Sequence, residues 1–317
     1  MHNNNRKKFI DILKGMGILL VVSGHIYGPL MSWALPCYVP LFFVASGYCT
    51  NKTVKIKGKF QKLIIPYFIF SFILLVLSGH PIDIKDILGI LYSRWCLYPL
   101  RCDNNIFLLR FGNGPLWFLT SMFVAYIFFM IIQQSNKRIW ILTLYFTLTY
   151  ILSFLPILLP WSIDTAFLMA IFIYCGTQIR EKNLLQKINR KCFLVIILLY
   201  ILLMIFWGNI NLSVRIYGRS LIILLVSAII GSLILMKISQ ILENCHIGKK
   251  LELIGKHSLS IFCLHIPFIN IWKDLTIIEH TNIPPTIDGI LCVIFVISVT
   301  YPLSLLLDKY VLRLIIR

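Results

Sequence analysis

The first apolar segment of the chain contains residues 9–25, which read FIDILKGMGILLVVSGH, and three of its side chains are ionisable. On an α-helix, eleven residues advance three turns plus roughly 20°, so Lys14 and His25 share one face and lie about 16 Å apart along the axis. Asp11 lies one turn before Lys14 on the same face. Ionisable groups inside a membrane span cost free energy and usually line a polar cavity or pathway. The segment therefore predicts a buried functional site in a membrane protein.

The composition of the whole chain also indicates a membrane protein. Hydrophobic residues make up 59% of the 317 residues and charged residues 13%, whereas soluble domains carry about 25% charged residues. We predict an all-α fold, a polytopic transmembrane helix bundle of about ten spans, that forms a single integral-membrane domain over residues 1–317. The apolar stretches of membrane-spanning length lie near 9–30, 33–50, 61–79, 115–134, 139–160, 163–179, 192–208, 219–236, 257–275 and 288–308.

The basic residues are distributed unevenly between the predicted loops. The net charge of +18 would suit a nucleic-acid-binding protein, but with the N-terminus inside, 22 of the 30 Lys and Arg residues lie in inner loops and termini and 7 in outer loops. Lys14 lies within a span. This bias follows the positive-inside rule and predicts that both termini are cytoplasmic. The basicity therefore indicates orientation, and we expect no nucleic-acid partner.

Motifs that the sequence lacks disfavour several other classes. The first segment carries Asp11 and Lys14, lacks a small-residue cleavage site and precedes further spans, so it is not a secretory signal. There is no Walker motif, which disfavours an ATP-driven pump. Nine cysteines show neither a Cys-x-x-Cys pair nor Cys/His zinc spacing, so we expect no metal. Cys96 and Cys102 share the predicted outer loop 80–114 and could form a disulfide.

His25 is the strongest candidate for chemistry. Imidazole accepts a proton near neutral pH and returns it, which suits activation of a hydroxyl nucleophile. Its position about 24 Å along the helix from Phe9 places it in the outer half of the bilayer. The alternative is a histidine that hydrogen-bonds to another helix for packing. Asp11 and Lys14 are either a structural ion pair near the inner surface or, for Lys14, a cation that meets an anionic ligand at the cytoplasmic mouth of the bundle.

A second group of candidates follows the second predicted span. Ser46 belongs to a Ser-Gly pair that lets a backbone or a ligand approach closely, although such pairs are also ordinary packing residues. Five lysines follow between residues 52 and 62, mostly as an orientation signal. Lys59 and Lys62 lie one turn apart and could present two cations to a phosphate-bearing cofactor.

Three further residues are candidates for substrate binding, each with a structural alternative. Trp117 lies near the start of the span at 115–134, where an interfacial anchor is the commoner role. Asp164 lies in a short outer turn, where an acid can be merely solvated. His265 is a second intramembrane histidine, for which packing is the alternative.

Read in order, these motifs resemble the acyltransferase-3 family of bacterial membrane O-acyltransferases. That family has a basic residue followed by ten residues and a histidine, which correspond here to Lys14 and His25. The string FFVASGY at 42–48 follows at the expected distance. These two motifs together carry most of the resemblance, which extends over nearly the whole chain.

The later motifs are weaker. Lys59 and Lys62 are similar to the family's Arg-x-x-Arg pair, and the segments at 114–118 and 258–265 follow the family order. Lysine stands at 14, 59 and 62 where arginine is frequent. Because lysine cannot reproduce the bidentate fork of arginine, phosphate contacts at these positions are less secure.

The resemblance implies transfer of an acetyl or related acyl group from acyl-CoA, with acetyl-CoA as the expected donor. The acceptor would be a hydroxyl of a cell-surface glycan or of its lipid-linked precursor, at the bacterial cytoplasmic (inner) membrane. His25 would be the general base, while Lys14 and Asp11 shape the path or orient the donor. Ser46, Lys59 and Lys62 would contact the donor. The oligomeric state is not indicated.

A transporter or flippase of glycolipids or small solutes is the main alternative. In that protein His25 and Lys14 would lie in a permeation path. Inverted repeats would favour this class, and the sequence shows none.

Overall fold

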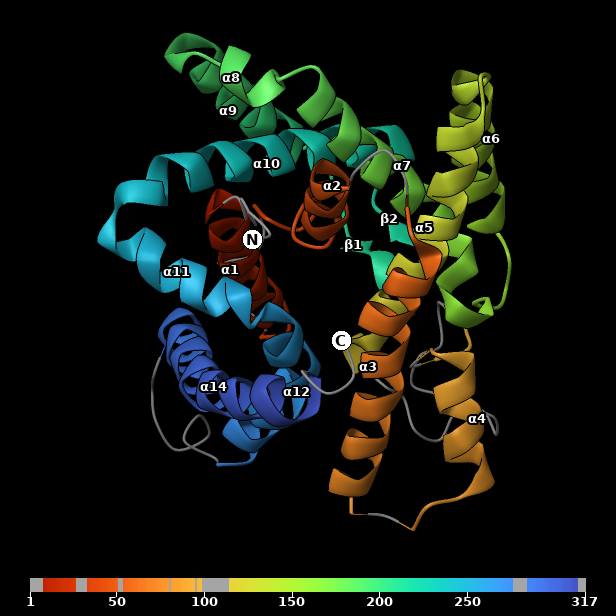
Figure 1. Cartoon of the computed structure of the whole chain (residues 1–317), viewed down its shortest axis with the longest axis vertical. Helices are drawn as coiled ribbons and strands as arrows, with labels where there is room; N and C mark the ends of the chain where they lie inside the picture. The colour runs from red at the N-terminus through yellow and green to blue at the C-terminus, as the bar shows by residue number, and fades with distance from the viewer. Residues whose placement is uncertain are drawn as a thin grey trace, which may run out of the picture. The chain divides into compact units, whose positions relative to one another are not determined.

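A computed structural model describes residues 8–26, 33–50, 54–79, 81–94, 96–98, 114–275 and 284–312 (Figure 1). Within these residues the fold is all-α, with thirteen α-helices and one short β-hairpin. Chain contacts divide the protein into two compact units. The first contains Met1–Ala45, Ile179–Phe206 and Ile223–Leu314, and the second contains Ser46–Gln178, Trp207–Ile222 and Ile315–Arg317. The expected single membrane domain over residues 1–317 stays a prediction.

Several helices are long and apolar enough to cross a membrane, as expected for an integral membrane protein. Among the described residues five helical segments meet this condition: Ile56–Leu77, Gly114–Gln134, Pro160–Glu181, Leu221–Asn244 and Pro285–Tyr310. Two shorter apolar helices are Pro40–Cys49 and Arg138–Leu152. A count of ten spans and cytoplasmic termini remain predictions.

The described residues of the first unit are mostly helical. It contains α1 (Lys8–Gly24), the first part of α2 (Pro40–Cys49), α8 (Leu184–Lys187), α9 (Arg190–Met204), most of α10 (Leu221–Ile241), α11 (His246–Lys256), α12 (Ser258–Asp274) and α14 (Pro285–Leu307).

Helix α1 lies directly against α11, with backbone close to backbone (Figure 1). A Cβ at Gly15 would lie 2.1 Å from the Leu251 carbonyl oxygen, and a Cβ at Gly255 would lie 1.7 Å from the Asp11 carbonyl oxygen. Any larger side chain would force the helices apart, so glycine permits this approach. The polar start of α1 is thereby held in a fixed place against α11.

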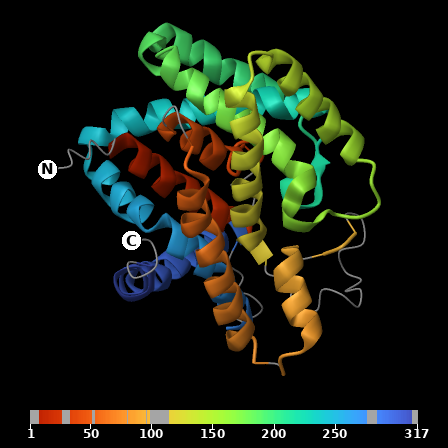
Figure 2. The same ribbon diagram turned by 45° about the vertical axis from the view of Figure 1, so that its right-hand side comes forward.

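The second unit contains the remaining helices and the hairpin. Helices α3 and α5 run side by side in both views (Figures 1 and 2), in orange and yellow respectively. The hairpin pairs its two strands in antiparallel register, Ile210 with Tyr217 and Asn211 with Ile216. The elements are α3 (Ile56–Leu77), α4 (Ile84–Tyr92), α5 (Trp117–Gln134), α6 (Arg138–Leu152), most of α7 (Ile163–Glu181), β1 (Ile210–Asn211) and β2 (Ile216–Tyr217), with the remainder of α2.

Some predicted spans are shorter in the structure. In the stretch 33–50 the helix begins only at Pro40, because Pro36 and Pro40 lack the backbone N–H that an earlier helix would need. In the stretch 139–160 the helix ends at Leu152, before Pro156 and Pro160.

Residues 237–256, which separate the predicted spans 219–236 and 257–275 and were expected to form an inner loop, are largely helical. They contain the end of α10 and all of α11, whose polar residues made the segment read as a loop. One face of α11 packs against α1, and this burial stabilises a helix that propensity alone leaves marginal.

Candidate active site

The ionisable residues of the first segment lie at the two ends of α1. Near its start, Lys14 Nζ lies 3.5 Å from Oδ1 of Asp11, so the predicted shared face is confirmed. The Asp11 side chain is buried, whereas the Lys14 side chain is 37% exposed. His25 directly follows Gly24, the last residue of α1. The structure therefore pairs Asp11 with Lys14 and places His25 about three helical turns further along.

His25 lies beside His265, the second histidine that the sequence places within a predicted span. The ring centroids are 5.1 Å apart and the ring planes are inclined at 48°. His25 is half-buried, and His265, from the middle of α12, is fully buried. The two candidates that the sequence presented separately thus form one pair within the first unit.

The hydrogen bonding of His265 defines which of its nitrogens carries the proton. Its Nδ1 lies 2.6 Å from the carbonyl oxygen of Phe262. Because a carbonyl only accepts, Nδ1 carries the hydrogen and donates it. A neutral imidazole has one N–H, so Nε2 then holds a lone pair. Among the described residues this buried Nε2 has no hydrogen-bond partner.

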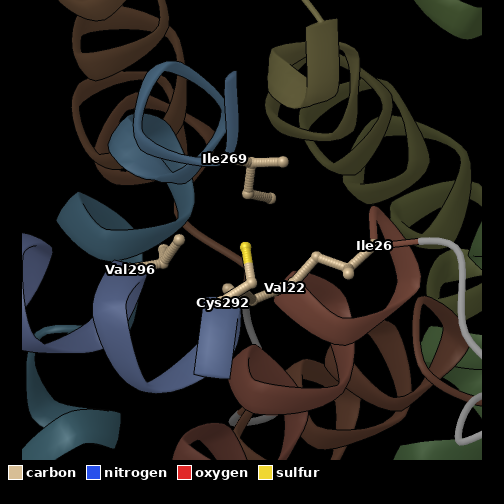
Figure 3. Close-up of a cluster of buried hydrophobic side chains, with 5 residues drawn as sticks. All are labelled: Val22, Ile26, Ile269, Cys292 and Val296. Atoms are coloured by element: carbon tan, nitrogen blue, oxygen red, sulfur yellow. The ribbon is translucent and has the colours of Figure 1, made fainter. Parts of the chain in front are cut away.

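A cluster of apolar side chains holds the histidine pair in place. Figure 3 shows Val22 from the last turn of α1, Ile26 just beyond that helix, Ile269 from α12, and Cys292 and Val296 from α14. Val22 and Ile26 flank His25 in the sequence, and Ile269 lies one turn after His265, on the same face of α12. Packing among these residues therefore fixes the two backbones that carry the histidines.

In the second unit, Ser46 and Lys59 both contact Tyr126 of α5. The hydroxyl groups of Ser46 and Tyr126 are hydrogen-bonded, and the Thr50 hydroxyl lies 3.3 Å from the same phenol oxygen. Lys59 Nζ lies 3.7 Å from the centroid of the Tyr126 ring, a cation–π contact. Tyr126 thus joins two predicted donor-binding residues. The sequence did not single it out, because a tyrosine in an apolar segment is ordinary.

The two remaining candidates of the α3 and α5 region differ in exposure. Lys62 lies one turn after Lys59 on α3 and is exposed. Trp117 is buried in the first turn of α5, with its ring edge-on to that of Phe118 at 6.4 Å between centroids. Lys62 is therefore open to an anion from outside the helix, and Trp117 is part of the interior.

Asp164 is fully buried between two arginines. Oδ1 of its carboxylate accepts a hydrogen bond from the Arg94 guanidinium, and Oδ2 lies 3.3 Å from Nε of Arg215. The backbone N–H groups of Leu159 and Thr165 donate to the same carboxylate at 3.1 and 3.0 Å. Burial lowers the pKa of the Arg94 guanidinium, and the charge of Asp164 acts in the opposite direction. Both carboxylate oxygens are therefore engaged.

The two arginines also bind backbone carbonyls of several chain segments. Arg94 donates to the carbonyls of Leu159 and Ser213 at 2.9 and 2.7 Å. Arg215 donates to three carbonyls, those of Leu152, Leu155 and Ile157. The arginines were counted only as outer-loop charges in the sequence, and no spacing signal linked them to Asp164.

A further polar cluster joins the start of α12 to the residues that follow α14. Asp308 Oδ2 lies 2.5 Å from Nδ1 of His257, and the Ser260 hydroxyl donates to Oδ1 of Asp308 at 2.5 Å. Serine and histidine contact opposite oxygens of one carboxylate, which is not the arrangement of a nucleophile with its base. An anionic Asp308 near the first turn of α12 suits the positive end of the helix dipole.

A disulfide between Cys96 and Cys102, which the sequence allows, involves Cys102, and this residue lies outside the described residues. Cys96 itself is buried in an apolar cluster with Leu158 and Val214.

In a comparison with protein-family models, residues 7–308 match a model described as an acyltransferase domain. The matched range contains every predicted site residue, from Asp11 to His265. Comparisons with curated proteins and with solved structures found no match.

Proposed function

Since the chain belongs to the acyltransferase-3 family and is therefore an acyltransferase, we propose that it moves an acetyl or related acyl group from acyl-CoA to a sugar hydroxyl. The acceptor we propose is a cell-surface glycan or its lipid-linked precursor. The location we propose is the bacterial inner membrane, with both termini cytoplasmic and about ten spans.

His25 is the general base in this proposal. The single observation that supports it is the 5.1 Å pairing of the half-buried His25 ring with the buried ring of His265. The His25 imidazole takes the proton of the acceptor hydroxyl as the oxygen attacks the thioester carbonyl. The tetrahedral intermediate then expels the CoA thiolate, and the imidazolium returns the proton to that sulfur.

The donor enters from the cytoplasmic side in this proposal. Acyl-CoA is a polyanion, and most Lys and Arg residues lie in predicted inner loops. Lys62 is exposed and available to a phosphate, whereas Lys59 is held over Tyr126 close to Ser46. Lys14, paired with Asp11, would orient the donor through its partly exposed side chain.

The acceptor-binding assignments follow from burial. Trp117 is buried and would form an apolar wall. Asp164 has both oxygens engaged, so we expect it to act on the acceptor only by holding the surrounding backbone. His265 contacts His25 directly and is considered below.

Thioester turnover tests the proposal. The purified protein in lipid nanodiscs would receive acetyl-CoA and a glycan extract, and free CoA and acetylated glycan would be measured by mass spectrometry. We expect His25→Ala to lower the yield of both products by about 10²- to 10⁴-fold. His246→Ala, which changes an exposed histidine of α11, is the matched control. Equal turnover by His25→Ala and the unmodified protein would refute the role of His25.

A second measurement separates the transferase from a transporter. We expect glycans from cells lacking the gene to lose the mass of an acyl group. Unchanged glycans together with solute movement in proteoliposomes would favour the transporter instead.

A further inference from the structure

His265 is buried with a polar atom that nothing in the described part of the chain satisfies. Its ring is fully buried, its Nδ1 donates to the Phe262 carbonyl, and its Nε2 has no partner among the described residues. A buried acceptor without a partner is destabilising, because it has lost its hydrogen bonds to water. If His265 served only for packing, an apolar ring of similar size would fill the same space without the free-energy cost of an unpaired nitrogen.

The ring next to this acceptor is that of His25. A hydrogen bond between two imidazole nitrogens has a heavy-atom separation of roughly 3 Å, which places the ring centroids roughly 5 Å apart. The observed centroid separation is 5.1 Å. His25 follows the last residue of α1 in a turn and is half-buried. A rotation of its ring is the movement that would aim an N–H at Nε2 of His265. Catalytic hydrogen bonds are often poorly aligned before substrate binds and tighten in the complex.

The backbone under both rings is fixed. The apolar cluster of Val22, Ile26, Ile269, Cys292 and Val296 packs the end of α1 against α12 and α14 (Figure 3). The Phe262 carbonyl sets the proton of His265 on Nδ1 and leaves the lone pair on Nε2. Nε2 of His265 is therefore held as a hydrogen-bond acceptor beside His25. As a general base, His25 needs its own proton on one particular ring nitrogen.

We propose that His265 is a positioning residue for His25. Its Nε2 accepts a hydrogen bond from one ring nitrogen of His25, so that the other ring nitrogen of His25 keeps its lone pair toward the acceptor hydroxyl. The proton that His25 gains during acyl transfer goes to that second nitrogen and later to the CoA sulfur. The first proton stays between the two rings throughout. This inference rests on the proposed role of His25 as general base.

Two amide substitutions separate this role from packing. In His265→Gln the amide reaches the position of Nε2 and supplies an acceptor to His25. In His265→Asn the shorter amide reaches the position of Nδ1, so it can bond to the Phe262 carbonyl but leaves His25 without its partner. Orienting partners of metal-bound histidines typically contribute about 10- to 100-fold to activity. We expect His265→Asn to lower kcat by about that factor with an unchanged KM for acetyl-CoA, and His265→Gln to recover most of the loss.

The double variant His25→Ala/His265→Asn shows whether the effect passes through His25. We expect it to be no less active than His25→Ala alone, because the partner that His265 positions is gone. Equal kcat for His265→Asn and the unmodified protein would overturn the inference while leaving the proposed function intact, provided that His25→Ala shows the expected loss of turnover. A His25→Ala variant as active as the unmodified protein would instead refute the proposed function.

A spectroscopic measurement works even where a variant is inactive. With ¹⁵N-labelled histidine, the two nitrogen shifts of His25 report which nitrogen carries the proton. We expect a single tautomer in the unmodified protein and in His265→Gln, and a mixture in His265→Asn. A His25 tautomer that is the same in all three proteins would overturn the inference. Should His265→Asn fail to fold, His265→Phe replaces it, with the same expected mixture.

Discussion

The histidine pair of the first unit and the arginine–aspartate cluster of the second unit are both buried polar groups. They differ in how completely their polar atoms are paired with hydrogen-bond or ion-pair partners. Asp164 has two arginine contacts and two backbone N–H donors, and Arg94 donates at all three of its nitrogens. His265 has one nitrogen bonded and one bare among the described residues. Nε of Arg215 also lacks a hydrogen bond within the described residues, but the Arg215 charge is paired with Asp164, 3.3 Å away. A cluster of paired charges rigidifies a fold, whereas a bare acceptor beside a titratable ring is available for chemistry.

This contrast has a practical consequence for reading substitutions. Changes in the arginine–aspartate cluster should lower stability first, and activity only as folded protein is lost. Changes in the histidine pair should lower activity at nearly constant stability. The following substitutions test that separation.

The largest effect is expected for His25→Asn. The side chain stays polar and similar in size, but it cannot take up a proton, so we expect the turnover of acetyl-CoA to fall by about 10²- to 10⁴-fold. The measurement is CoA release per folded protein, together with the thermal unfolding midpoint. His246→Asn on the exposed part of α11 is the control. A large drop in the unfolding midpoint would assign His25 to packing and remove the contrast.

Asp164→Asn should produce the opposite pattern. The substitution leaves Arg94 and Arg215 buried without their anion, and breaking a buried pair in this way costs about 3–5 kcal/mol of unfolding free energy. The measurement is denaturant unfolding in detergent, with Asp274→Asn, an exposed carboxylate at the end of α12, as the control. Unchanged stability with lost acceptor turnover would show that Asp164 contacts substrate after all.

Gly255→Ala should disturb the start of α1. Its new Cβ would lie 1.7 Å from the Asp11 carbonyl oxygen, so α1 and α11 must separate. Overpacking of this kind costs about 1–3 kcal/mol. Unfolding measurements would use Gly58→Ala as the control, since a Cβ there meets nothing within 4 Å. If Gly255→Ala were as stable as Gly58→Ala, the backbones of α1 and α11 could not lie as close together at this position as described.

Tyr126→Phe should have the smallest effect. It removes the hydroxyl bonded to Ser46 but keeps the ring beneath Lys59, so we expect a loss of about 0.5–1.5 kcal/mol. The KM for acetyl-CoA, measured alongside, shows whether the Ser46–Tyr126 contact orders a donor site. Tyr150→Phe on the exposed surface of α6 is the matched control. If Tyr126→Phe and Tyr150→Phe were equally stable, the hydrogen bond between Ser46 and Tyr126 would contribute nothing measurable, and Ser46 would serve only for packing.

Local spacing predicted part of the candidate site correctly. The positions of Asp11 and Lys14, three residues apart, predicted their shared face, and the ion pair at 3.5 Å confirms it. The motif order also predicted the family, which the match over residues 7–308 confirms. The helices in the stretches 33–50 and 139–160 are shorter than the apolar runs, because prolines precede the start of the first helix and follow the end of the second.

The spacing of residues in the sequence could not predict which distant segments of the chain are in contact. The sequence offered His25 and His265 as separate candidates, and it offered Asp164 without Arg94 or Arg215. Helix α11 read as a loop because its polar face dominated its composition. In each case the missing information was which face of one helix lies against which other segment.

The sequence by itself determined that the chain is an integral membrane protein, that it is an acyltransferase, and that Asp11 and Lys14 share a face. Composition, motif order and helical periodicity are properties of the sequence itself, so they can be determined without the folded structure. Only the tertiary structure decided that His265 lies 5.1 Å from His25 and that Asp164 lies between two arginines. The physical reason is that glycine contacts and apolar packing set how helices meet, and these act between residues far apart in the chain.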